Sequence, residues 1–183
     1  MNCMDKCIFI PIMENELSFT CPCCGEVYEL NLCFGNEYPY SYFSVPEDEI
    51  DKRVELTKSM CVIDEEHFFH RCRITIPIIN RTESLIFNIW TSISEDNFVL
   101  RNDSWDDPAR VNQGPYFGWL NNIIPTYGET LNIKTMAYEN EVGFIPTLKV
   151  IEENHPLTYD QENGITFDEA IKKAQHIFDW HKK

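Results

Sequence analysis

The chain has 183 residues, of which 43% are hydrophobic and 13% aromatic, and this apolar content excludes a disordered or low-complexity protein. Fifteen basic and 30 acidic residues give a net charge of −15, which repels nucleic-acid phosphates and anionic lipid head groups. The length predicts one domain over residues 1–183, and the charge predicts a basic protein as partner, with neither nucleic acid nor membrane as a ligand.

The amino terminus predicts a cytoplasmic protein. It reads MNCMDKCIFIPIM, without the basic start and cleavage site of a secretory signal. Its apolar run, Cys7 to Met13, is far shorter than the roughly 20 residues that cross a bilayer. Thiols stay reduced in the cytoplasm, so the 8 cysteines indicate buried thiols or metal ligands. We expect plain buried thiols at Cys3, Cys7, Cys33 and Cys72.

The first predicted elements surround a cysteine cluster. Leu17 to Thr20 has the pattern of a short strand that enters the cluster, and Glu26 to Leu30 that of a strand that leaves it. Pro46 and the three acidic residues after it are typical of a helix start, because negative charge is favourable at the positive end of the helix dipole. Ile50 and Val54, spaced i and i+4, are expected to begin the buried stripe of that helix.

The middle of the chain is rich in aromatic and β-branched residues and predicts a hairpin. Its strands are His67 to Ile79 and Ser84 to Ile93, joined by a polar turn over residues 80–83. Pro77 lacks the amide donor of a ladder, so the first strand is expected to end or bulge there. The second strand carries apolar groups on both faces, which indicates an inner strand covered on both sides.

One helix and a second hairpin are predicted after this hairpin. Ser94 is a predicted N-cap, and its helix must end before Pro108, which disfavours helical geometry in the preceding residue. A second hairpin is expected from strands over Leu131 to Ala137 and Phe144 to Ile151, with a turn over residues 139–143.

A carboxy-terminal helix completes the predicted fold. Thr166 and Glu169 form a capping box. The apolar stripe behind it consists of Phe167, Ile171, Ala174 and Phe178. Central strands with helices at both sides predict an α+β fold, with a mixed or antiparallel sheet flanked by helices and an N-terminal Cys-x-x-Cys knuckle.

The knuckle carries the clearest chemical signal. Cys21 and Cys24 in Cys21-Pro22-Cys23-Cys24-Gly25 have the spacing at which two thiolates bind one tetrahedral Zn²⁺, and Gly25 lets the backbone close around it. We favour one structural zinc ion with Cys61 as a further ligand. Other residues that could complete the site are Cys23, Cys33, Cys72, His67 and His70.

Two other interpretations of the knuckle remain open. The first is a redox pair, because a Cys-Pro-x-Cys sequence can hold a thiolate of low pKa. Such a pair needs the N-terminus of a helix after the cysteines, whereas residues 26–30 alternate like a strand. The second is unreactive thiols in a β-turn.

Outside the knuckle, no sequence pattern identifies a reaction. The chain has no glycine-rich phosphate loop, nucleophile elbow or His-Glu-x-x-His run. His67 and His70 are an odd step apart, so a strand would point them to opposite faces. Acidic clusters such as Asp106 and Asp107 are typical of solvated surface.

The order of short motifs from about Phe19 onward resembles a bacterial family known as domain of unknown function 2199. The resemblance implies a bacterial, single-domain, cytosolic protein and supplies no activity. Two departures from the family pattern are the extra thiol of Cys23 and Tyr28, near which relatives often have histidine. The motifs are Cys21-x-x-Cys24-Gly25, Cys61-Val62-Ile63-Asp64, His67-Phe68-Phe69-His70-Arg71, Ile76-Pro77-Ile78, Trp90 with Ser92, Tyr116-Phe117-Gly118-Trp119-Leu120, His155-Pro156-Leu157 and Gly164-Ile165-Thr166.

Small size, strong negative charge and missing catalytic motifs favour a non-enzymatic binding protein. An immunity-type inhibitor of a basic toxin is the most specific form of this prediction. The alternative is a small-molecule enzyme whose pocket is lined by aromatic residues and a histidine, namely Trp90, Tyr116, Trp119 and His155.

Overall fold

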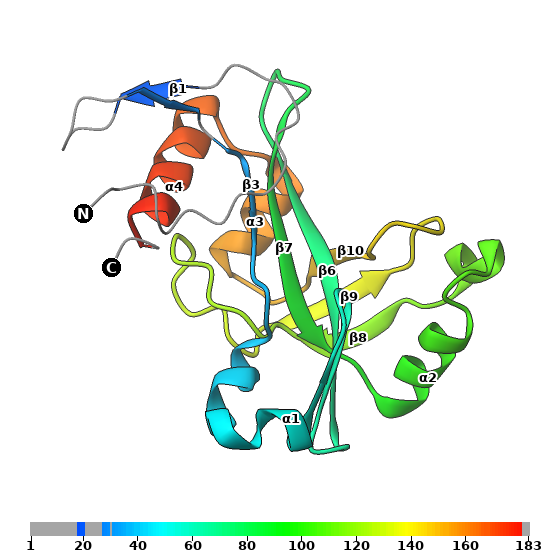
Figure 1. Ribbon diagram of the computed structural model, residues 1–183. Helices are drawn as coiled ribbons and strands as arrows, with labels where there is room; N and C mark the ends of the chain where they lie inside the picture. Colours follow the sequence, from blue (N-terminus) through cyan, green and yellow to red (C-terminus); the bar gives the residue numbers. More distant parts are fainter. Residues whose placement is uncertain (1–17, 21–26, 30, 181–183) are drawn as a thin grey trace.

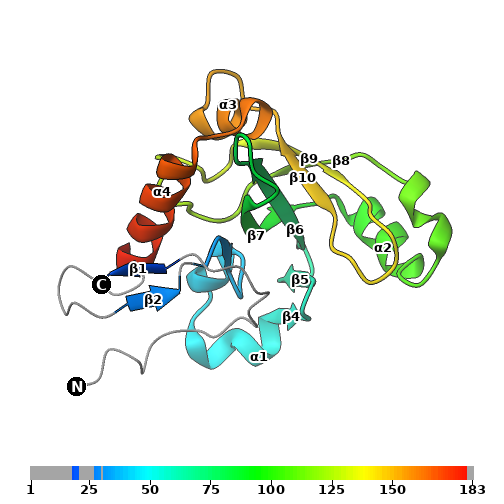
Figure 2. The ribbon, with the colours of Figure 1, turned by 90° about the horizontal axis from the view of Figure 1, so that it is seen from above.

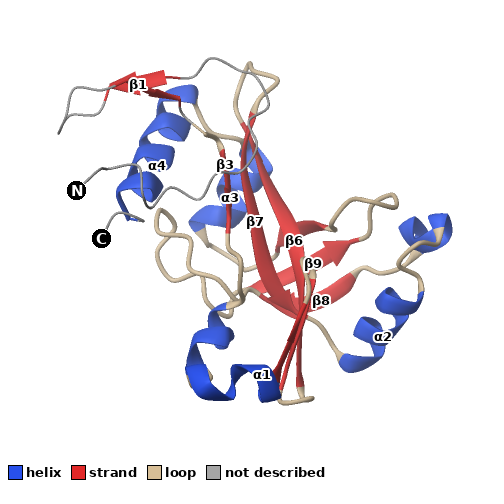
Figure 3. Ribbon diagram, in the orientation of Figure 1, coloured by secondary structure: helices blue, strands red, loops and turns tan. Residues whose placement is uncertain are grey.

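The computed structural model of the chain describes residues 18–20, 27–29 and 31–180. The fold is α+β, as predicted, with a mixed eight-stranded sheet and four α-helices in this part of the chain (Figure 1; Figure 3). The strands are β1 Ser18–Thr20, β2 Val27–Glu29, β3 Cys33–Gly35, β4 Val54–Leu56, β5 Met60–Ile63, β6 His67–Pro77, β7 Ser84–Ser92, β8 Tyr116–Trp119, β9 Lys134–Tyr138 and β10 Thr147–Val150. The helices are η1 Tyr40–Ser44, η2 Glu47–Glu49, α1 Ile50–Arg53, α2 Glu95–Asp103, η3 Pro108–Asn112, α3 Pro156–Asn163 and α4 Phe167–Trp180.

The predicted central hairpin is the backbone of the sheet. β6 and β7 pair antiparallel along the whole of β7, from Phe69 opposite Ser92 to Pro77 opposite Ser84. β3 joins β7 in parallel and β10 joins β6 in parallel, so the sheet is mixed, in the order β3-β7-β6-β10-β9-β8. β5 pairs with β6 and carries β4 on its other side, while β1 and β2 form a separate antiparallel pair.

The sheet is bent, so that the end of its last strand, β8, lies beside β7. Leu120, just after β8, forms an antiparallel bridge with Thr91, and Asn121 donates its amide proton to the Trp90 carbonyl at 2.8 Å. At Gly118 the backbones come so close that a Cβ atom would lie 1.9 Å from the Ser92 carbonyl oxygen. The connection between β7 and β8, which includes α2 and η3, is therefore held to the sheet at both ends.

Two apolar clusters lie on opposite faces of the central hairpin. The main core includes Ile74, Ile76, Leu85 and Phe87 and receives α3 and α4 from outside. The smaller cluster contains Cys61, Ile63, Phe69, Trp90 and Val45. α4 lies on one side of the molecule and α2 on the other (Figure 1; Figure 2).

Several element boundaries differ from the sequence prediction. The helix after Pro46 consists of the short turns η2 and α1, and Val54 is extended, with φ −124° and ψ 121°, because it begins β4. β9 begins at Lys134 because Asn132 has a positive φ of 61°, which belongs to a turn. β10 begins at Thr147, and Phe144 is exposed in the preceding turn.

The helix ends agree better with the sequence. Ser94 caps α2 by accepting the Asn97 amide proton, and the Thr166–Glu169 capping box forms with a Thr166 N to Glu169 Oε2 distance of 2.8 Å. The buried stripe of α4 is rotated from the predicted one, since Ala174 is buried as expected but the other fully buried positions are Ala170 and Ile177. No helix in the described ranges is both long and apolar enough to cross a bilayer.

Candidate functional site

Of the three favoured zinc ligands, Cys61 lies within the described residues. Cys21, Cys23 and Cys24 lie outside the described residues, so the knuckle stays a prediction. Cys61 is fully buried on β5, where burial raises the pKa of its thiol to about 12. Cys72 is buried as expected, whereas Cys33 is only half-buried. Within residues 18–20, 27–29 and 31–180, no three His, Cys, Asp or Glu side chains form a group that could hold a metal ion.

The four residues of the predicted aromatic pocket lie in different surroundings. Trp90 is buried in the smaller cluster and donates its Nε1 proton to the Asn36 carbonyl at 3.1 Å, while Tyr116 belongs to the main core. Trp119 is 42% exposed and packs edge to face on Phe117. His155 caps α3, where its Nδ1 accepts the Leu157 amide proton at 3.2 Å.

A hollow of about 110 Å³ lies between β3, η1 and the end of α4. None of the four predicted pocket residues lines it. Its walls are mainly apolar and include Phe34, Phe43, Phe87, Ile123, Ile177 and Trp180.

The segment between β7 and β8 buries its basic residues and exposes its acidic ones. We call residues 94–112 the α2–η3 segment, which contains five acidic and two basic residues. Both basic residues, Arg101 and Arg110, are buried. The acidic residues Glu95, Asp96, Asp103, Asp106 and Asp107 are all exposed.

The two arginines attach this segment to the sheet through one carboxylate. Glu139, just after β9, accepts a hydrogen bond from Arg101 Nε at 2.6 Å and one from Arg110 Nε at 3.0 Å. Arg110 Nη2 also donates to Glu139, and its Nη1 donates to the Trp105 carbonyl at 2.9 Å. All three charged side chains are at least 98% buried, since their exposed fractions are 1%, 2% and 0%.

Trp105 packs near the two buried guanidinium groups. Its ring lies 5.2 Å from the Arg101 Cζ and 5.5 Å from the Arg110 Cζ, within the range of cation–π attraction. Trp105 itself is 38% exposed. This indole therefore packs near the buried cations and also contributes to the protein surface.

Met60 and His70 of the sheet lie next to the buried Arg101. Met60 Sδ accepts a hydrogen bond from Arg101 Nη1, and Met60 is the β-sheet partner of His70. The His70 ring is fully buried, with the Tyr116 ring 6.3 Å away. Burial and then the nearby Arg101 charge lower the pKa of His70 well below its usual value, so the ring is neutral at pH 7.

Tyr116 and Cys72 share the same interior. Burial raises the pKa of the Tyr116 hydroxyl, the Glu139 carboxylate raises it further, and the two arginines oppose this rise. Burial also raises the pKa of the Cys72 thiol. These side chains therefore stay protonated at neutral pH, and neither is activated as a nucleophile.

Sequence reasoning missed this cluster because its arginines lie among acidic residues and its Glu139 lies in a predicted turn. The expected opposite orientation of His67 and His70 is confirmed, since His67 is exposed and His70 buried. The sequence of α2 holds one signal of the cluster. No apolar stripe runs along this helix, so it cannot be attached to the sheet by apolar contacts alone, and its one basic residue, Arg101, follows Val99 and Leu100.

Fold and site together define a mixed-sheet α+β protein with an acidic outer segment anchored by a buried Arg–Glu–Arg cluster. The family model that matches residues 20–165 is described as "Uncharacterized protein conserved in bacteria (DUF2199)". The chain belongs to this bacterial family, which confirms the resemblance seen in its motifs. Neither a curated protein nor a solved structure matches the chain.

Proposed function

We propose that the chain is a non-enzymatic binding protein that holds a basic protein against its α2–η3 segment. The observation that carries this proposal is the separation of charge within the segment. Its five acidic side chains face solvent while its two cations face Glu139 in the interior. A surface of one sign attracts a partner of the opposite sign and accelerates their encounter.

The same segment also exposes apolar side chains, which a charged surface alone would not need. Val99 is 50% exposed, Leu100 45%, Val111 44% and Trp105 38%. Protein interfaces combine apolar contacts at the centre with polar groups around them, and tryptophan is frequent among the residues that dominate the affinity. The segment therefore offers both attraction at a distance and apolar area for contact.

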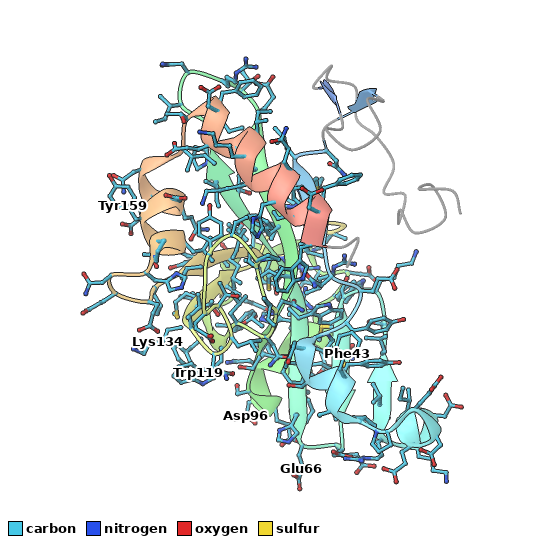
Figure 4. All side chains as sticks on the ribbon, turned by 90° about the vertical axis from the view of Figure 1, so that its left-hand side faces the viewer. Phe43, Glu66, Asp96, Trp119, Lys134 and Tyr159 are labelled. Atoms are coloured by element: carbon cyan, nitrogen blue, oxygen red, sulfur yellow. The ribbon has the colours of Figure 1, made fainter. Side chains whose placement is uncertain are left out.

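Acidic residues of the neighbouring β5–β6 turn extend this surface. Glu65 and Glu66 are exposed there. The start of α2 lies beside the turn, because the Phe68 and Phe98 rings are 5.1 Å apart. Figure 4 shows Glu66 and Asp96 at the same end of the molecule. A basic partner at the α2–η3 segment would thus meet negative charge from two elements.

The specific form of the proposal is an immunity-type protein that neutralises a basic toxin. It is supported by the small size of the chain, its charge of −15 and the anchoring of the acidic segment. Anchoring matters because a segment that is already ordered loses less entropy when a partner binds.

The test compares two variants with the same change of net charge. Asp103→Lys/Asp106→Lys reverses two exposed charges in the segment, and Glu153→Lys/Glu162→Lys reverses two exposed charges near α3. Each variant and the original chain are immobilised and exposed to an extract of the native bacterium at low and high salt, and the retained proteins are identified and titrated.

The expected result is a basic protein that the original chain and the α3 variant retain at low salt. Its affinity falls about tenfold or more with the α2–η3 variant, and high salt releases it, because exposed charges attract less under screening. Equal retention by both variants would contradict the proposed surface, and binding that high salt does not weaken would contradict the role of charge.

A further inference from the structure

The buried Arg–Glu–Arg cluster carries more positive than negative charge. Arg101 and Arg110 share the single carboxylate of Glu139. In the described part of the protein these three are the buried side chains that carry a charge, since the buried His70 is neutral. Burying a charge without compensation is costly, because the interior solvates an ion far less well than water does. One unit of positive charge in this cluster therefore lacks a counter-charge among the described residues.

In the described part of the chain, three of the five buried side-chain polar atoms without a hydrogen-bond partner belong to Arg101 and His70, and the other two are Arg71 Nε and Thr126 Oγ1. Among the described residues, Arg101 Nη2 and both ring nitrogens of His70 are buried and have no hydrogen-bond partner. Met60 connects the two side chains, since it contacts Arg101 through its sulfur and pairs with His70 across β5 and β6. Two separate observations, the excess charge of the Arg–Glu–Arg cluster and the unsatisfied polar atoms, thus both involve Arg101.

The chemistry of these atoms selects the kind of ligand. The unpartnered guanidinium nitrogen can only donate, and a neutral imidazole has one N–H donor. Nearby Arg101 and Arg110 repel cations, so a metal ion is disfavoured despite the histidine. A monovalent anion would accept hydrogen bonds from both side chains and neutralise the excess charge.

We propose that Arg101 and His70 form a buried binding site for a small monovalent anion, with Trp105 as its cover. Because both side chains are completely buried, the expected ligand is a small ion such as a halide or formate. Trp105 is the expected point of entry, because its ring packs near both guanidinium groups and is itself 38% exposed. This site lies behind the α2–η3 segment, so it does not depend on the proposed binding of a basic protein.

The first test measures thermal unfolding of the full chain at constant ionic strength. Sodium gluconate, whose anion is too large for the site, is replaced stepwise by sodium chloride, bromide or formate. At a concentration about ten times the Kd, we expect Tm to rise by about 3–6 °C, because the ligand binds the folded state alone. His70→Phe removes the imidazole donor while filling its space and should abolish the rise.

His67→Phe, on the exposed side of the same strand, is the matched control and should retain the full rise. An equal effect of the small anions on the His70→Phe variant would overturn the proposal, because the effect would then be a general one of salt. An absence of any difference between gluconate and the small anions would overturn it as well.

The second test locates the ion directly, so it does not depend on the behaviour of a variant. Crystals grown with sodium bromide should show anomalous density within hydrogen-bond distance of Arg101 Nη2 and a ring nitrogen of His70. A water molecule at that position with no anomalous signal, or bromide confined to the surface, would overturn the proposal.

Discussion

Glu139→Gln tests whether one carboxylate anchors the α2–η3 segment. The substitution keeps the shape of the side chain and removes its charge. Its new amide group must face either Arg101 Nε, which is 2.6 Å from one carboxylate oxygen, or the Arg110 guanidinium, whose Nε is 3.0 Å from the other. One donor then faces another donor, and two buried cations lose their counter-charge.

The expected loss of stability is large. Removing one partner of a buried ion pair costs about 3–5 kcal/mol, since the charge that remains is neither hydrated nor paired. For a chain of this length, each kcal/mol lowers Tm by about 2–4 °C, so the expected fall is about 6–20 °C. Urea unfolding followed by circular dichroism gives the change in free energy of unfolding.

The matched control is Glu141→Gln, an exposed glutamate two residues further along. Surface substitutions of this kind change stability by about 0.5 kcal/mol or less. A loss below about 1 kcal/mol for Glu139→Gln, close to that of the control, would refute the view that Glu139 holds the two arginines.

Three further predictions concern other parts of the chain. Because the folded-state pKa of His70 lies well below the unfolded value of 6.5, the unfolded state takes up a proton that the folded state does not, and stability falls by about 1.4 kcal/mol per pH unit below pH 6.5. Urea unfolding at several pH values should show this loss for the original chain and the His67→Phe variant but not for His70→Phe; an unchanged pH profile in the last would contradict it. Gly118→Ala places a methyl group 1.9 Å from the Ser92 carbonyl and should cost about 3 kcal/mol or more of unfolding free energy, whereas Gly143→Ala, with no atom within 4 Å, should cost about 1 kcal/mol, and similar losses at both would count against the close approach. Elemental analysis of the untagged protein should find one equivalent of zinc that disappears when Cys21 and Cys24 are replaced by serine, and protein that contains no zinc would disprove the knuckle.

Local sequence rules predicted the elements that depend on local interactions. The central hairpin follows from its aromatic and β-branched residues, and the start of α2 follows from the side chain of Ser94, which satisfies a backbone amide of the first turn. Local rules do not predict α3, because a residue before a proline, here His155, favours extended backbone. His155 is extended, with φ −89° and ψ 135°, but that geometry is also the one a helix N-cap adopts.

The candidate site could not be predicted in the same way, because it depends on contacts between distant residues. Arg101 and Glu139 are 38 positions apart, and Arg110 and Glu139 are 29 apart. Charged residues are expected at the surface, so nothing local indicates that these two arginines face inward. Only the bend of the sheet, which brings β9 beneath α2, supplies the carboxylate that makes their burial stable.

The bridge between Thr91 and Leu120 has a consequence for how relatives can diverge. It holds the two ends of the connection from β7 to β8 next to each other on the sheet. Insertions and deletions within such a connection leave the register of the strands unchanged. The entropic cost of closing the connection grows only slowly with its length. A change in the length of this connection would therefore leave the pairing of β7 with β6 and of β8 with β9 in place, provided that Arg101 and Arg110 still reach Glu139.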